Sequence, residues 1–222
     1  MPVIATRAGR SGQAYGYVPG ASGSYFATPD SAANSIANDI DIIVRVVLND
    51  YTPASEVCII SKWTAAGNQR SWTLDLTPTS TLKFYISADG STSSEGTSTS
   101  AGTLVDRQAY WIRVTRAKVT GETLFYQSSD AGLPAGWTQI GNAVTIAANS
   151  AIFDGTAGIV PCGIDAGTSL LAAGSVYRAQ IYNGIGGTLA VDFNPNLWGS
   201  GDTFTAATGE VWTRNGNAKL FR

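Results

Sequence analysis

Apolar and polar residues alternate along most of the chain with a period of two. Between residues 40 and 48 every second residue is Ile, Val or Leu, while Asp41 and Arg45 fall on the opposite face. This alternation is typical of a β-strand that buries one face. Similar alternation or short apolar runs predict further strands at 24–27, 57–63, 71–76, 81–87, 110–115, 123–128, 158–164, 176–182 and 189–193.

Turn signals rich in Gly, Pro and Asp separate nearly all of these segments. Asn215-Gly216 is a strong signal for a type I′ turn and predicts a hairpin of 210–213 with 218–221. No long segment has apolar residues at helical spacing, and only 31–37 predicts a short helical turn. Closely spaced strands without intervening helices predict an all-β antiparallel sandwich or barrel.

The composition indicates one folded domain with a large core. The chain has 222 residues, of which 44% are hydrophobic and 14% charged, and it contains six Trp, nine Tyr and seven Phe. This apolar content excludes general disorder. The formal net charge of -2 gives no reason to expect a nucleic-acid partner. No apolar run reaches the ~20 residues that span a bilayer, so we expect no membrane insertion.

The first residues differ from the rest of the chain, because they are rich in Gly, Ala and Ser and lack clear alternation. We therefore expect an N-terminal arm at 1–22 and a single domain at 23–222. One interpretation of the arm is a disordered leader, and the other is a segment that docks on a partner or a trimer mate. Val3-Ile4 and Tyr15-Gly-Tyr17 favour docking, because a solvated tail does not need such apolar groups.

The chain contains no histidine and only two cysteines, Cys58 and Cys162. The absence of histidine excludes Ser-His-Asp and Cys-His nucleophile systems and every His-ligated zinc or iron site. Two cysteines without histidine also exclude a structural zinc site. No apolar segment follows Arg7 and Arg10, so no secretory signal peptide is expected. A protein made without one starts in a reducing cytosol, where both cysteines are expected as free thiols.

Short sequence pieces between Tyr25 and Leu220 carry a family resemblance through their order and spacing. They are Tyr25-Phe-Ala-Thr-Pro-Asp30, Ile40-Asp-Ile-Ile-Val-Arg-Val-Val47, Ile59-Ile-Ser-Lys-Trp63, Arg70-Ser-Trp-Thr-Leu-Asp-Leu76, Ala109-Tyr-Trp-Ile-Arg-Val-Thr115, Phe153-Asp-Gly-Thr-Ala157, Val176-Tyr-Arg-Ala-Gln180, Ala190-Val-Asp-Phe193 and Ala207-Thr-Gly-Glu-Val-Trp-Thr213. Their order resembles the laminin-G-like members of the concanavalin-A-like lectin/glucanase superfamily. Specifically, it is similar to the version found in structural proteins of tailed bacteriophages.

This resemblance implies a two-sheet antiparallel jelly-roll sandwich. It also implies a virion protein made in the host cytoplasm: a capsid decoration, a fibre or a minor tail component. The expected partners are other virion proteins of the capsid or tail, further copies of the chain in a homo-oligomer, and a glycan on the host cell surface. The alternative is a soluble carbohydrate-binding module without a virion role, because a fold by itself does not decide between these uses.

The same superfamily contains β-glucanases, which resemble one another in a strand carrying Glu-x-Asp-x-x-Glu. Alternation along such a strand presents three carboxylates on one face for acid and nucleophile roles. This chain has no such triplet, because its four glutamates are isolated and Asp39-x-Asp41 has no third member. We therefore expect no enzymatic activity, although two carboxylates from different segments can still meet in space.

Laminin-G-like domains sometimes hold calcium at a rim of the sandwich. The resemblance therefore implies a calcium site as one option for this chain. Asp154, Asp165 and Asp202 are the candidate ligands, and each lies near a glycine. The alternative is that each aspartate bonds its own backbone in a turn. No other cofactor is expected.

Carbohydrate binding needs an aromatic platform with polar groups beside it. By alternation along their strands, five side chains point away from the core: Asp75, Lys83, Tyr85, Trp111 and Arg113. If their strands are neighbours, these residues form a mixed aromatic and charged patch. The alternative is a structural cross-strand ion pair of Asp75 with Arg113. The other tryptophans are expected at the rim (Trp137 and Trp198) or in the core (Trp63, Trp72 and Trp212).

Overall fold

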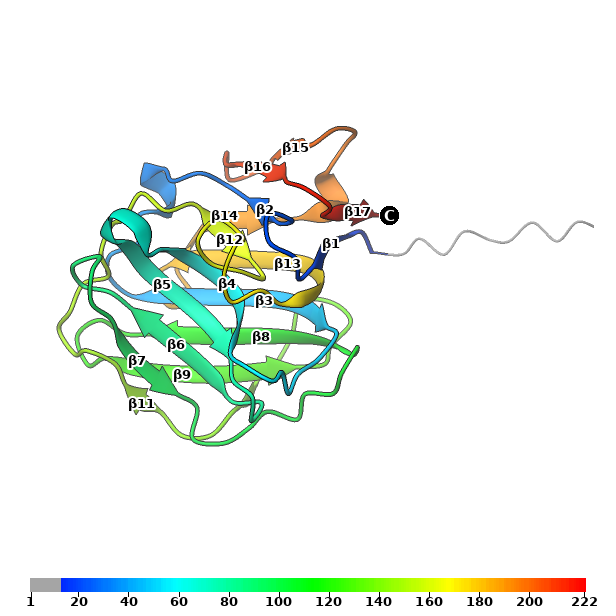
Figure 1. The fold of residues 1–222 in the computed structure, drawn as a ribbon. Coiled ribbons are helices and arrows are strands. Elements are labelled where there is room, and N and C mark those ends of the chain that lie inside the picture. The colour runs from blue at the N-terminus through cyan, green and yellow to red at the C-terminus, as the bar shows by residue number, and fades with distance from the viewer. Residues whose placement is uncertain (1–12) are drawn as a thin grey trace, which may run out of the picture.

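The structure, a computed structural model, describes residues 13–222. Its strands pair antiparallel and form three sheets (Figure 1). The two larger sheets stack as the layers of a jelly-roll sandwich, with β4 to β7 in front of β3, β8 and β9 in the view of Figure 1. The predicted all-β sandwich is therefore confirmed.

Each sheet draws its strands from distant parts of the chain. The nine-stranded sheet contains β1 (Tyr15–Pro19), β3 (Ile40–Leu48), β8 (Ala109–Arg116), β9 (Glu122–Ser128), β10 (Thr138–Gln139), β11 (Val144–Thr145), β13 (Ala173–Asn183), β14 (Thr188–Phe193) and β17 (Lys219–Phe221). The five-stranded sheet contains β4 (Val57–Thr64), β5 (Gln69–Leu76), β6 (Leu82–Ile86), β7 (Ser94–Thr97) and β12 (Ile159–Pro161). The three-stranded sheet contains β2 (Phe26–Ala27), β15 (Thr203–Thr205) and β16 (Val211–Arg214).

The main core fills the space between the two large sheets. Ile42 and Val44 of β3 and Leu74 of β5 belong to one cluster of buried apolar side chains. Trp72, also in this cluster, is only 1% exposed. The alternation that predicted the strands thus also predicted which face of each strand points inward.

Residues 15–19 were expected in the N-terminal arm 1–22, but they form β1 inside the sandwich. β1 pairs with β13 on one side and with β17 on the other. Inward and outward residues alternate along β1, but one of the inward residues is Gly16, which gives no apolar signal in the sequence. A larger residue does not fit there, because a Cβ would lie 2.7 Å from Phe26 Cε2. The expected boundary is therefore corrected for this strand, while residues 1–12 lie outside the described residues.

The predicted hairpin of 210–213 with 218–221 is wrong. β16 pairs with β15 and β2, whereas β17 pairs with β1. The turn at Asn215-Gly216 instead binds the backbone of Tyr25, since Asn215 N–H donates to Tyr25 O at 2.8 Å. This turn therefore passes the chain from the three-stranded sheet to the nine-stranded sheet.

Three short 3-10 helices are the helical elements of the described residues: η1 (Ala32–Asn34), η2 (Ala66–Asn68) and η3 (Pro195–Leu197). The turn predicted at 31–37 corresponds to η1. No helix within 13–222 has the length and apolar character needed to cross a membrane. Cys58 and Cys162 are buried free thiols, as expected.

The tryptophans follow the predictions in part. Trp72 and Trp212 lie in the main core, as expected. Trp198 is also a core residue at 3% exposure, so its expected place at the rim is wrong. Its ring stacks on Phe204 with centroids 5.5 Å apart, which encloses it between the three-stranded sheet and the core.

Candidate functional site

The five predicted site residues do not form one patch. Asp75, Lys83 and Tyr85 lie on the five-stranded sheet, on neighbouring strands β5 and β6. Trp111 and Arg113 lie on β8, in the nine-stranded sheet. Strand parity correctly pointed all five away from the main core, but parity does not say which sheet a strand joins.

The alternative interpretation, an ion pair of Asp75 with Arg113, is also wrong. Arg113 makes a bidentate pair with Asp41 of β3, at 2.8 Å and 2.7 Å. Its guanidinium lies 5.4 Å from the ring centroids of both Tyr126 and Trp137. The ion pair and the two aromatic rings hold the guanidinium in place, which indicates a structural role for Arg113 on the outer face of the nine-stranded sheet.

Trp111 is covered as well, at 4% exposure. The guanidinium of Arg45 lies over its ring at 5.9 Å and over Tyr177 at 5.1 Å. A ring covered in this way offers no platform for a sugar. The candidate site is therefore limited to the predicted residues on the five-stranded sheet, Asp75, Lys83 and Tyr85.

A second apolar cluster, separate from the main core, lies on the outer face of that sheet. It contains Cys58, Trp63 and Ile164, with Tyr85 and Leu170 packed against it. Trp63, expected in the main core, belongs to this cluster instead. Exposed sheet faces normally carry polar residues, so an apolar cluster here needs a covering element or a ligand.

The covering element is the loop 162–172 after β12. Cys58 N–H donates to Leu170 O at 2.7 Å, and Ser61 Oγ donates to Gly163 O at 2.8 Å. Four non-glycine residues of this loop have left-handed backbone angles: Cys162, Asp165, Ala166 and Leu170. Left-handed angles are costly for side chains larger than glycine and concentrate at functional sites.

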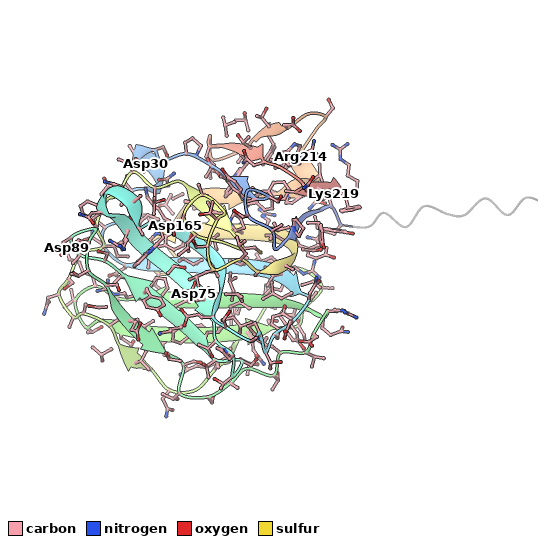
Figure 2. The ribbon with its side chains drawn as sticks, viewed as in Figure 1. Asp30, Asp75, Asp89, Asp165, Arg214 and Lys219 are labelled. Carbon is pink, nitrogen blue, oxygen red and sulfur yellow. The ribbon has the colours of Figure 1, made fainter. Side chains whose placement is uncertain are left out.

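A cavity of about 90 Å³ lies between this loop and the sheet. Asp75 lies near the middle of the sheet in Figure 2, below the loop that carries Asp165. The cavity combines two aromatic walls, apolar loop residues and two carboxyl groups. The lining residues are Glu56, Trp63, Thr73, Asp75, Tyr85, Ile164 and Leu170.

Asp75 is the most unusual group of the cavity, because it is a carboxyl with 0% exposure. Thr73 Oγ1 donates to its Oδ1 at 2.6 Å, while its Oδ2 has no hydrogen-bond partner among the described residues. Burial raises the pKa of Asp75 to about 8; the Thr73 hydrogen bond opposes the rise and the nearby charge of Glu56 adds to it. Asp75 therefore holds a proton at neutral pH.

A polar network closes the other side of the cavity. The Tyr85 hydroxyl donates to Glu56 Oε1 at 2.9 Å. Lys83 Nζ lies 3.6 Å from Glu56 Oε2 and 3.0 Å from Glu95 Oε2, and 4.6 Å from the Tyr85 ring centroid. Burial raises the pKa of Tyr85, so its hydroxyl stays a donor at neutral pH. This network fixes the Tyr85 ring beside the cavity.

Sequence patterns did not indicate Glu56, Ile164 or Leu170 as site residues. Glu56 precedes β4 in a loop, and the two apolar residues belong to the loop 162–172. Their convergence depends on long-range packing of loops against the sheet, for which no local periodicity exists.

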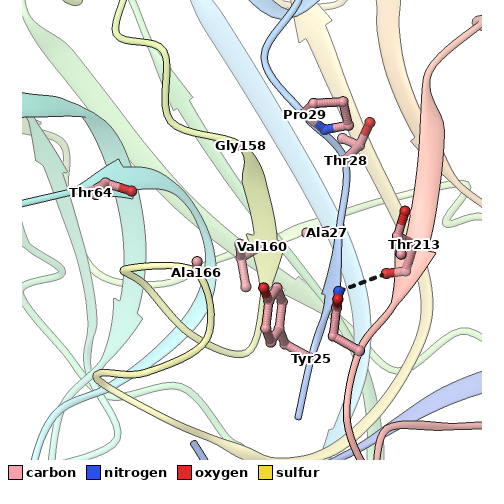
Figure 3. Close-up of a pocket in the computed structure, with 10 residues that line it drawn as sticks. Tyr25, Ala27, Thr28, Pro29, Thr64, Gly158, Val160, Ala166 and Thr213 are labelled. Carbon is pink, nitrogen blue, oxygen red and sulfur yellow. Dashed lines mark hydrogen bonds between the residues drawn. The ribbon is translucent and has the colours of Figure 1, made fainter. Parts of the chain in front are cut away.

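A larger cavity of about 310 Å³ lies at the rim, between β2, β12 and β16. Figure 3 shows Tyr25, Val160 and Thr213 around it. Its lining is uncharged, and the buried Thr28 hydroxyl there lacks a partner among the described residues. An unpaired buried carboxyl costs more than an unpaired hydroxyl, so the cavity at Asp75 has the stronger need for a ligand.

The three candidate calcium ligands lie apart in the described structure. Asp165 accepts a hydrogen bond from Ala65 N–H at 2.7 Å, and Asp202 forms an ion pair with Arg214. Within residues 13–222 no three His, Cys, Asp or Glu side chains gather in a way that fits a metal ion. Asp154 lies in the segment between β11 and β12. The calcium site for which these aspartates were candidate ligands therefore has no support among residues 13–222.

Comparisons with known proteins locate the fold. No family model and no curated protein sequence matches the chain. A candidate carbohydrate-binding protein from Bacteroides ovatus matches with a TM-score of 0.62 and 12% identity, over 94% of this chain and 59% of that protein. The chain thus spans less than two thirds of that protein's length.

Two further solved structures agree. The module CBM40 of the Ruminococcus gnavus IT-sialidase, bound to α2,3 sialyllactose, matches with a TM-score of 0.52 and 11% identity, over 73% of this chain and 89% of the module. Domains LG4-5 of the mouse laminin α1 chain match with a TM-score of 0.56 and 11% identity, over 85% of this chain and 45% of theirs. At such identities the likeness shows the fold alone, a laminin-G-like and concanavalin-A-like sandwich.

Proposed function

We propose that this chain is a non-catalytic carbohydrate-binding domain, and that the cavity around Asp75 is its binding site. The observation that carries the proposal is the fully buried carboxyl of Asp75, which borders a cavity with two aromatic walls and whose Oδ2 is unpaired among the described residues. A sugar supplies both an apolar face for the aromatic rings and hydroxyl groups for the carboxyls. The carbohydrate-binding neighbours support the proposal through their fold.

The experiment is a glycan screen followed by calorimetric titration of the best ligands. Tyr85→Ala should weaken binding about tenfold or more, because the loss of one aromatic contact removes at least ~1.4 kcal/mol. Tyr126→Ala is the matched control, since Tyr126 lies on β9 in the opposite sheet. Equal losses in both variants would place the site elsewhere, and no binding to any glycan would refute the function.

The virion setting remains a separate prediction, supported by the order of the sequence segments. None of the three solved structures described above comes from a bacteriophage. We propose the host-surface glycan as the ligand in that setting, with homo-oligomers mounted on capsid or tail. Mass spectrometry of purified particles tests this setting, and absence of the chain from them would refute it.

A further inference from the structure

We propose that the cavity around Asp75 receives the acetamido group of an N-acetylated amino sugar, while the sugar ring lies outside it against Tyr85. This inference rests on the proposed function and goes further, because it names the ligand class of that site. Four observations lead to it: the size of the cavity, its apolar wall, its two carboxyl groups, and the position of Lys83.

The cavity is small. Its volume is about 90 Å³, whereas the cavity at the rim has about 310 Å³. A small substituent of a sugar therefore suits this cavity better than a whole ring.

One side of the cavity is apolar. Trp63, Ile164 and Leu170 line it and belong to the second apolar cluster. A hydroxyl or hydroxymethyl group would leave this wall without a suitable partner, whereas the methyl group of an acetamido substituent packs against it.

The two carboxyl groups supply the complementary hydrogen bonds. Asp75 Oδ2 lacks a partner among the described residues, and burial raises the pKa of this carboxyl to about 8. A protonated carboxyl donates to a carbonyl oxygen, which is the acceptor of an acetamido group. Glu56 also lines the cavity. Its carboxylate already accepts from Tyr85 and contacts Lys83, and a remaining lone pair accepts from the amide N–H.

Charge argues against the other small groups that sugars carry. An ammonium group would compete with Lys83, whose Nζ already contacts Glu56 and lies over the Tyr85 ring. A sugar carboxylate would approach Glu56 and Glu95, with Lys83 as the single cation of this network. The acetamido group is neutral and avoids both conflicts.

The test compares two oligosaccharides with the same linkage, N-acetylated chitotriose and cellotriose, by calorimetric titration of the full chain at neutral pH. The acetylated ligand should bind about tenfold tighter or more, the ratio supplied by one buried methyl group and one net hydrogen bond. Fully deacetylated chitotriose should lose this advantage.

Two variants of Asp75 locate the effect. Asp75→Leu removes the donor and should abolish the preference for the acetylated ligand, while Asp75→Asn keeps an N–H donor and should retain it. Thermal melts confirm that both variants fold. Equal affinity for all three ligands, or an unchanged preference in Asp75→Leu, would overturn this inference and leave the proposed function standing. Failure to bind any glycan would refute both.

Discussion

Thr73 and Asp75 lie two residues apart on β5, and the Thr73 hydroxyl donates to Asp75 Oδ1 at 2.6 Å. Both side chains point to the outer face of the five-stranded sheet, yet both are buried there. The hydrogen bond fixes the orientation of the carboxyl, and Oδ2 is left buried beside the cavity without a partner among the described residues. A group held in this way costs stability unless it is neutral or bound.

Asp75 should make the protein less stable as the pH rises. Its pKa is about 8 in the folded state and ~3.9 in an unfolded chain. Between these values the folded state keeps a proton that the unfolded state has released, so the free energy of unfolding falls by up to ~1.4 kcal/mol per pH unit. Urea titrations at a series of pH values should show this fall in the wild type and a flatter profile in Asp75→Asn. Parallel profiles would show that Asp75 does not titrate in this range.

Arg113 should stabilise the fold through Asp41, whose side chain is only 2% exposed. Arg113→Met leaves that carboxylate buried without its main partner and should cost ~2 kcal/mol, a value reduced for the partial exposure of the arginine. Arg214→Met is the control, because Asp202, the partner of Arg214, is exposed and such pairs contribute ~0–1 kcal/mol. Chemical unfolding measures both. Equal losses would mean that burial of Asp41 is unimportant.

No polysaccharide hydrolysis should be detectable. Glu56 and Asp75 line one cavity, but Glu56 is engaged by Tyr85 and Lys83 and only Asp75 Oδ2 is unpaired. Glycoside hydrolysis needs one carboxyl as acid and another, free, as nucleophile or base. Reducing-sugar assays on β-glucans, chitin and bacterial cell-wall glycans measure this. Release at enzyme-like rates that Glu56→Gln abolishes would contradict it.

The strands could be predicted from the sequence because burial of one face imposes alternation on each strand. Residues 40–48 match β3 throughout, and the outward direction of Asp75, Lys83 and Tyr85 was predicted from the same signal. The distribution of strands between the sheets could not be predicted, since it depends on pairing between distant segments. Trp111 was therefore grouped with residues that lie on the other sheet.

Local turn chemistry was misleading for a related reason. Asn215-Gly216 favours a tight turn in any context, but which strands flank it depends on partners elsewhere. Here the backbone of Asn215 forms hydrogen bonds with the backbone of Tyr25, and not with the facing strand of a hairpin. The loop 162–172 was equally hard to predict. Gly167 is one of its left-handed residues, but the other four are Cys162, Asp165, Ala166 and Leu170, which are neither glycine nor asparagine.

Ala166→Gly should stabilise the protein by ~1 kcal/mol. Ala166 has a φ of 53°, in the left-handed region that disfavours any residue with a Cβ. Ala135→Gly is the control, since Ala135 is an exposed loop residue without a positive φ. That change should be neutral or destabilising, because glycine only adds freedom to the unfolded chain. Differential scanning calorimetry separates the two, and a lower melting temperature for Ala166→Gly would contradict the strain.

Gly16 tests whether β1 belongs to the sandwich. A Cβ at Gly16 would lie 2.7 Å from Phe26 Cε2 and 3.1 Å from Phe193 Cζ, closer than side chains tolerate. Gly16→Ala should therefore cost ~1–3 kcal/mol, the usual result of overpacking a core. Gly132→Ala is the matched control, because nothing lies within 4 Å of a Cβ there. If residues 15–19 were instead part of a detached arm, both substitutions would leave the urea midpoint unchanged.

Deletion of residues 1–20 should likewise weaken the cooperative melt, because it removes β1 from between β13 and β17.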